Sequence, residues 1–196
     1  MVNYSQPLIL NNISWWVNGV SNRYIITWFC GIAANGIYSV SYKIPSILVM
    51  FQGIFSQAWT MSAVQGYDKD DKNGFFTRMY QSYNLCMVLV CSVLIMLSRV
   101  MAKVLYANDF YNAWKYVPFL LIASVFGALS GYVGGIYAAT KDTKIFAKTS
   151  IMGAVTNLLL TFVLVWKVGV MGAAIASPVS YGLIWYLRIK GINKYM

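Results

Sequence analysis

Five polar side chains in the first third of the sequence could bind a charged, hydroxyl-rich ligand. Ser39, Lys43, Ser46 and Gln57 recur at three- and four-residue steps, through Met50 and Gly53, and so share one face of a helix. Arg23 adds a second cation upstream. Ammonium and guanidinium groups with hydroxyls and an amide can bind phosphate and sugar oxygens. The set predicts substrate binding by Arg23, Ser39, Lys43, Ser46 and Gln57.

The same residue inventory argues against an enzyme. The chain has no His and no Glu, and every acid lies in a polar break between apolar runs: Asp68, Asp70, Asp71, Asp109 and Asp142. Membrane-embedded catalysis needs a base or a metal site, and neither can be built without such groups. We therefore expect no catalytic residue, no metal site and no cofactor. The three cysteines are interpreted as small core residues.

The polar stripe must be positioned by membrane helices. The 196-residue chain is 59% hydrophobic and 10% charged, with a mean hydropathy of +0.60, whereas soluble domains carry about 25% charged residues. Its apolar runs approach the roughly 20 residues that cross a bilayer. We predict an all-α membrane protein with residues 1–196 forming one domain. Its bundle of about six transmembrane helices would cover residues 7–26, 36–64, 80–104, 113–139, 145–166 and 170–187.

The charge distribution indicates an orientation. The chain has a net charge of +10, but no basic stripe with interleaved aromatics follows a soluble face, which argues against nucleic acid as a partner. Nine of the 15 Lys and Arg lie on one predicted side of the membrane. They flank the breaks after the second and fourth predicted helices or lie in the C-terminal tail, which includes Arg188. The excess predicts cytoplasmic termini and contact with anionic membrane lipids.

Lys43 has two interpretations at this stage. The predicted helix 36–64 places it about seven residues inside, or roughly 10 Å at 1.5 Å per residue. A lysine at that depth can extend its ammonium group to the membrane surface or line a hydrated cavity. Arg23 is open to the same two interpretations, as an interfacial anchor or as a cavity residue. Asn157 is predicted to form a hydrogen bond between helices.

Several segments, in their order and spacing, resemble a known transporter family. They are SWW at 14–16, SNRYII at 21–26, GIYS at 36–39, KIP at 43–45, QAW at 57–59, NLLL at 157–160 and GVMGAAIA at 169–176. Together they resemble the C-terminal half of the polysaccharide, or O-antigen, flippases of the multidrug/oligosaccharidyl-lipid/polysaccharide exporter superfamily. The resemblance implies half of a transporter of twelve to fourteen helices in the cytoplasmic membrane.

The activity that the resemblance implies is the transfer of an undecaprenyl-diphosphate-linked oligosaccharide between membrane leaflets for polysaccharide biosynthesis. The lipid-linked oligosaccharide would then be the ligand, and an N-terminal half or a second subunit would be a partner. Asn22 departs from the family, which commonly has an acid before the arginine. Two alternatives stay open: a multidrug or small-solute exporter of the same superfamily, and a half-transporter that is inactive alone.

Overall fold

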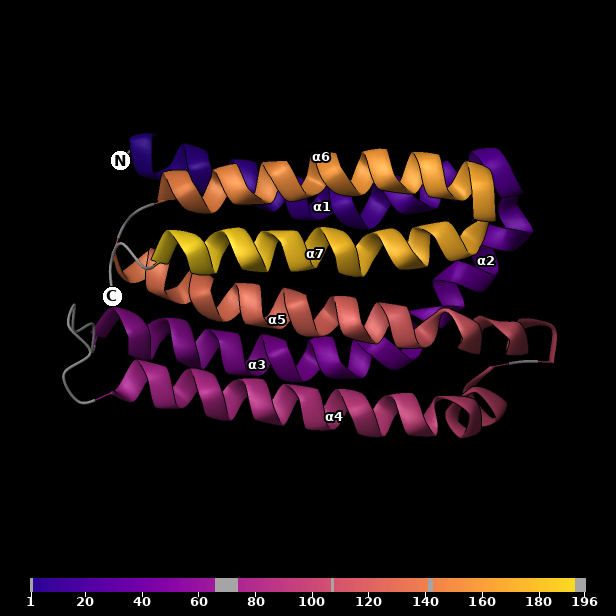
Figure 1. Cartoon of the computed structure of the whole chain (residues 1–196), viewed down its shortest axis with the longest axis horizontal. Helices are drawn as coiled ribbons and strands as arrows, with labels where there is room; N and C mark the ends of the chain where they lie inside the picture. Colours follow the sequence, from indigo (N-terminus) through magenta and orange to yellow (C-terminus); the bar gives the residue numbers. More distant parts are fainter. Residues whose placement is uncertain (1, 66–73, 107, 141–142, 193–196) are drawn as a thin grey trace.

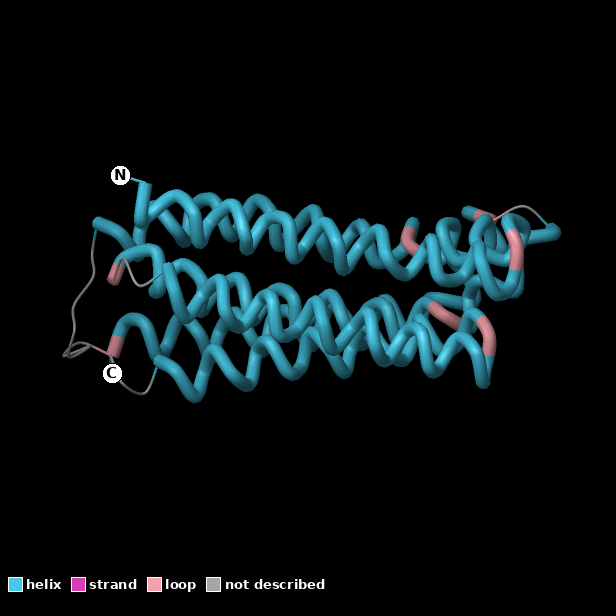
Figure 2. Tube along the Cα trace, turned by 90° about the horizontal axis from the view of Figure 1, so that it is seen from above, coloured by secondary structure: helices cyan, strands magenta, loops and turns pink. Residues whose placement is uncertain are grey.

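All the regular structure in the described residues of the computed structural model is helical. The structure describes residues 2–65, 74–106, 108–140 and 143–192. Six long helices lie side by side along the longest axis, with two short helices at one end of the bundle (Figures 1 and 2). The elements are α1 (Val2–Cys30), α2 (Ile32–Ser41), α3 (Lys43–Gln65), α4 (Phe75–Leu105), the 3-10 helix η1 (Asn108–Lys115), α5 (Val117–Ala139), α6 (Thr143–Val168) and α7 (Val170–Ile192).

Four of these helices are long and apolar enough to cross a membrane. They cover Phe75–Leu105, Val117–Tyr137, Ile145–Val168 and Val170–Gly191. Helices α1 and α3 are also long, with 29 and 23 residues, but they are not among these four candidate spans. The predicted class, an all-α membrane protein, is therefore confirmed. The described chain supplies four candidate spans of the roughly six predicted.

The single helix predicted over residues 36–64 is wrong. The structure divides this segment at Tyr42 into α2 and α3, and α2 runs obliquely across the end of the bundle (Figure 1). Pro45 has no N–H to donate to the Ser41 carbonyl, so the regular helical ladder cannot continue through this point. The Tyr42 N–H instead donates three residues back, to the Ser39 carbonyl at 3.3 Å. Lys43 consequently begins a helix rather than lying seven residues inside one.

Glycines on α5 and α6 let neighbouring helices approach closely. A Cβ on Gly135 would lie 2.8 Å from the Trp59 indole of α3, and one on Gly153 would lie 2.1 Å from the Ile184 side chain of α7. Small residues commonly occupy such membrane-helix contacts. Gly169 joins α6 to α7 with a φ of 66°, a left-handed conformation that glycine adopts without steric cost. The predicted break at residues 168–169 is thus confirmed.

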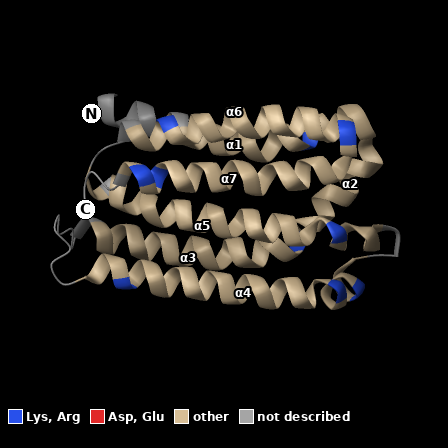
Figure 3. Cartoon of the chain, in the orientation of Figure 1, with Lys and Arg blue, Asp and Glu red and all other residues tan. Residues whose placement is uncertain are grey.

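The Lys and Arg residues of the described chain lie toward the two ends of the bundle, away from its middle (Figure 3). Helix α1 begins and α7 ends at the same end (Figure 1), as an even number of crossings would require. One assignment in the charge count is wrong: Arg188 is only 1% exposed and lies inside the bundle, not in a solvated tail. Without Arg188, the side predicted to be cytoplasmic has eight basic residues instead of nine. The predicted orientation stays a prediction.

Candidate functional site

Three of the predicted binding residues lie on the exposed side of α3. Lys43, Ser46 and Gln57 are all exposed, and the Ser46 hydroxyl donates to the Lys43 carbonyl at 2.7 Å. Ser39 is half-buried and belongs to α2, so the break at Tyr42 separates it from the other three. Lys43, Ser46 and Gln57 are called the α3 polar face below.

Arg23 is exposed on α1 and lies near the junction of α2 and α3. The adjacent residue, Asn22, donates a hydrogen bond to the Tyr38 hydroxyl of α2 at 3.2 Å, and Tyr42 directly precedes Lys43. These two tyrosines are hydrogen-bonded to one another at 3.1 Å. The structure therefore brings Arg23 and the start of the α3 polar face to one end of the bundle, although the two cations come from different helices.

Behind Arg23, a buried polar network joins α1, α2, α6 and α7. Asn22 is 1% exposed, and its amide nitrogen donates to the hydroxyls of Tyr38 at 3.2 Å and Ser177 at 3.1 Å. Its amide oxygen accepts hydrogen bonds from Asn157 and Thr161, both at 2.9 Å. All of the groups that contact this amide are neutral. Where the resembled family commonly has an acid, this chain has a fully hydrogen-bonded amide.

The predicted role of Asn157 is confirmed by this network. Its side-chain nitrogen also donates to the Asn18 carbonyl at 3.4 Å, and its oxygen accepts from the Ser180 hydroxyl at 3.3 Å. Asn157 thus connects α6 to both α1 and α7. Because water is scarce inside a membrane bundle, such bonds satisfy polar groups that would otherwise be costly to bury.

Replacing Asn22 with leucine is expected to lower the free energy of unfolding by about 2–4 kcal/mol, because each buried group left unpaired costs about 1–3 kcal/mol. Thermal unfolding of the full chain in detergent measures this loss. Asn12→Leu is the matched control, since Asn12 is exposed on the same helix. Equal stability of the two variants would show that the network does not stabilise the bundle.

A second buried polar cluster surrounds Arg188. Its guanidinium donates to the Ser130 carbonyl at 2.8 Å, the Ser150 hydroxyl at 2.7 Å, and Thr149 and Asn11 side-chain oxygens at 3.3 Å each. It also lies 4.1 Å from the ring centroid of Phe146. One side chain of α7 therefore connects α1, α5 and α6, and all of these acceptors are neutral.

The sequence pattern contains a signal for the burial of Arg188. Ser177, Ser180, Ile184 and Arg188 are separated by three, four and four residues, and all four are buried. This spacing places them on one side of a helix. Because the predicted helix ended at residue 187, Arg188 was assigned to the tail.

The exposed and buried sets have different chemical capacities. The exposed cations can attract an anionic ligand, whereas the buried amides of Asn22 and Asn157 already contact other polar groups of the bundle. In the part of the chain that the structure describes, no three His, Cys, Asp or Glu side chains gather closely enough to hold a metal ion. The arrangement thus suits binding and helix packing.

Comparison with known proteins gives distant relatives. Over its whole length the chain is 19% identical to the probable low-salt glycan biosynthesis flippase Agl15 of Haloferax volcanii, and spans 42% of that protein. It is 21% identical to an uncharacterized membrane protein of Methanocaldococcus jannaschii, of which it spans 38%. No protein-family model matches the chain.

A solved structure shares the fold. It is a MOP superfamily transporter from Pyrococcus furiosus, which is 14% identical with a TM-score of 0.79. The alignment covers 97% of this chain and 44% of the transporter. The resemblance to flippases of this superfamily is therefore confirmed. The chain spans less than half the length of each of these proteins, as a C-terminal half would.

Proposed function

We propose that the chain is the C-terminal half of a flippase that moves a lipid-linked oligosaccharide across the cytoplasmic membrane. In this proposal α1, α3, α4, α5, α6 and α7 all cross the membrane, with both ends in the cytoplasm. Arg23, Ser39 and the α3 polar face line a hydrated cavity shared with the other half. The carrier proposed for the oligosaccharide is undecaprenyl diphosphate.

The observation that carries this proposal is the α3 polar face. Helix α3 exposes Lys43, Ser46 and Gln57 among large apolar side chains such as Met50 at 71% and Ile54 at 64%. An apolar surface suits lipid. A cation facing lipid is costly, so ionisable groups in membrane helices usually face protein or a water-filled cavity. The α3 polar face thus supports a hydrated cavity on that side of the bundle.

The charges fit an anionic headgroup. A diphosphate carries oxygens that Lys43 and Arg23 can contact, and Ser46 and Gln57 supply hydroxyl and amide groups for sugars. No carboxylate occurs in the described parts of the spanning helices. The membrane potential would assist outward movement of an anion by about 2.3 kcal/mol per charge per 100 mV.

A complementation experiment tests the proposal. In cells that lack their own glycan flippase, the chain alone is expected to restore no surface glycan, because half of the cavity is missing. Fusion to the part of the Haloferax volcanii flippase that this chain does not cover is expected to restore export. Surface glycan is measured by lectin binding, with protein levels matched.

Three outcomes would contradict the proposal. Full complementation by the chain alone, shown to be monomeric in the membrane, would mean that it is not a half. A fusion that expels cationic dyes but exports no glycan would indicate the multidrug alternative. A fusion that folds and moves neither would indicate an inactive half-transporter.

A further inference from the structure

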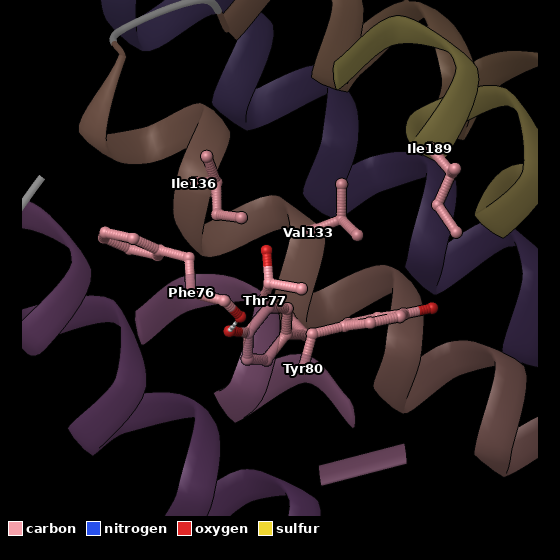
Figure 4. Close-up of a pocket in the computed structure, with 7 residues that line it drawn as sticks. Phe76, Thr77, Tyr80, Val133, Ile136 and Ile189 are labelled. Carbon is pink, nitrogen blue, oxygen red and sulfur yellow. Dashed lines mark hydrogen bonds between the residues drawn. The ribbon is translucent and has the colours of Figure 1, made fainter. Parts of the chain in front are cut away.

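An apolar groove runs along the bundle on α4, α5 and α7. None of these three helices carries the proposed cavity residues. Two pockets mark it. The first holds about 170 Å³ and is lined by Phe76, Thr77, Tyr80, Tyr132, Val133, Ile136 and Ile189. Figure 4 shows Val133 and Ile136 on α5, with Ile189 on α7 and with Thr77 and Tyr80 on α4. The pocket is thus formed by three helices.

The second pocket continues along the same helices. It holds about 350 Å³ and includes Asn84 and Cys91 of α4, Leu129 of α5 and Trp185 of α7. Between the two pockets, the Trp185 indole N–H donates to the Tyr80 hydroxyl at 3.0 Å. This hydrogen bond crosses the groove from α7 to α4 and divides it. Each compartment is therefore shorter than the membrane is thick.

Two exposed cations are adjacent in sequence to residues that line the first pocket. Arg78 directly follows Thr77, and Lys190 directly follows Ile189. The first turns of α4 and the last turns of α7 lie at the same end of the bundle (Figure 1). An apolar slot with two cations at the helix ends is complementary to an acyl chain joined to a negatively charged headgroup.

We propose that the first pocket binds one acyl chain of an anionic membrane phospholipid, with Arg78 and Lys190 contacting its phosphate. A bilayer lipid fits better than the polyprenyl carrier of the proposed substrate, because the Trp185–Tyr80 hydrogen bond interrupts the groove before a long chain could extend along it. The other half of a transporter fits less well, since the proposed cavity residues are on α1, α2 and α3. This site is independent of the proposed transport activity.

Native mass spectrometry of the full chain in detergent tests the site. The probes are phosphatidylglycerol and phosphatidylcholine with identical acyl chains. Phosphatidylglycerol is expected to bind more tightly. The double variant Arg78→Gln/Lys190→Gln is expected to weaken phosphatidylglycerol binding about thirty-fold, roughly fivefold for each lost charge, and to leave phosphatidylcholine binding unchanged. Lys103→Gln/Lys167→Gln removes two exposed charges at the opposite end and is the matched control.

A second variant tests the slot itself. Thr77→Trp places an indole at an exposed position in the lining and is expected to weaken binding of both lipids. Leu85→Trp, at an exposed position farther along α4, is its control. Equal affinity for the two lipids, an unchanged phosphatidylglycerol affinity in Arg78→Gln/Lys190→Gln, or equal losses in the controls would overturn the proposal. Tenfold tighter binding of a polyprenyl phosphate at the same site would also overturn it.

Discussion

Lys43→Gln in the complete fused transporter is expected to abolish glycan export while the protein level stays unchanged. The side chain is exposed at the first residue of α3, so the substitution should change the free energy of unfolding by less than about 0.5 kcal/mol. Glutamine keeps a polar group but removes the positive charge that is proposed to contact the substrate diphosphate. Export is measured as surface glycan, normalised to transporter in isolated membranes.

A graded series separates charge from geometry. Lys43→Ala should behave like Lys43→Gln, and Lys43→Arg should retain part of the activity because it keeps the charge with a different shape. Lys103→Gln is a matched control, since it removes an exposed lysine at the last turn of α4. Normal export by Lys43→Gln would show that Lys43 is an interfacial anchor, and the proposed binding role would then be rejected.

Arg188→Ala is expected to lower the free energy of unfolding by about 2–5 kcal/mol. Truncation leaves a cavity where one of the largest fully buried side chains had been. It also removes the donors that reach Ser130 on α5, Asn11 on α1 and Ser150 on α6. The loss is measured by thermal unfolding of the full chain in detergent.

Lys190→Ala is the control for Arg188→Ala, because Lys190 is two residues away on α7 and exposed. Arg188→Lys should recover little of the loss, since one ammonium group cannot reproduce a planar group that donates to four side chains or carbonyls on three helices. If Arg188→Ala were as stable as Lys190→Ala, the cluster would not hold these helices together.

The helical class and most helix positions could be predicted because long apolar runs are a local property of the sequence. The tight turn at Gly169 and the bonds made by Asn157 also followed from local patterns. Where a helix begins depends on more than these patterns. The sequence pattern predicted one continuous helix over residues 36–64, but the structure ends one helix at Ser41 and begins another at Lys43.

That boundary changed the position of the main candidate residue. Periodicity correctly placed Lys43, Ser46 and Gln57 on a common face, and Gln52 on the other side, where its amide nitrogen would lie 3.5 Å from a Cβ on Gly131. Periodicity could not show that Ser39 belongs to a separate helix. The depth of Lys43 in the bundle depends on how α2 crosses the bundle end, which is set by packing between distant segments.

The burial of Arg188 was not predicted because three basic residues near the end of a membrane protein are typical of an interfacial tail. Only the tertiary arrangement distinguishes Arg188 from its neighbours. Its acceptors come from residues 11, 130, 149 and 150, far away in sequence. No local pattern reports partners at such separations, although the buried serines of α7 mark the side on which Arg188 lies.

The buried asparagines of α1 have a consequence for synthesis of the protein. Asn11 and Asn22 are synthesised well before their hydrogen-bonding partners on α6 and α7, which lie 135 to 177 residues later. Until those helices are made, α1 carries polar amides that lipid alone cannot satisfy. Helix α1 is therefore translated long before it can be fully packed, and we expect it to stay near the insertion machinery until α6 and α7 arrive.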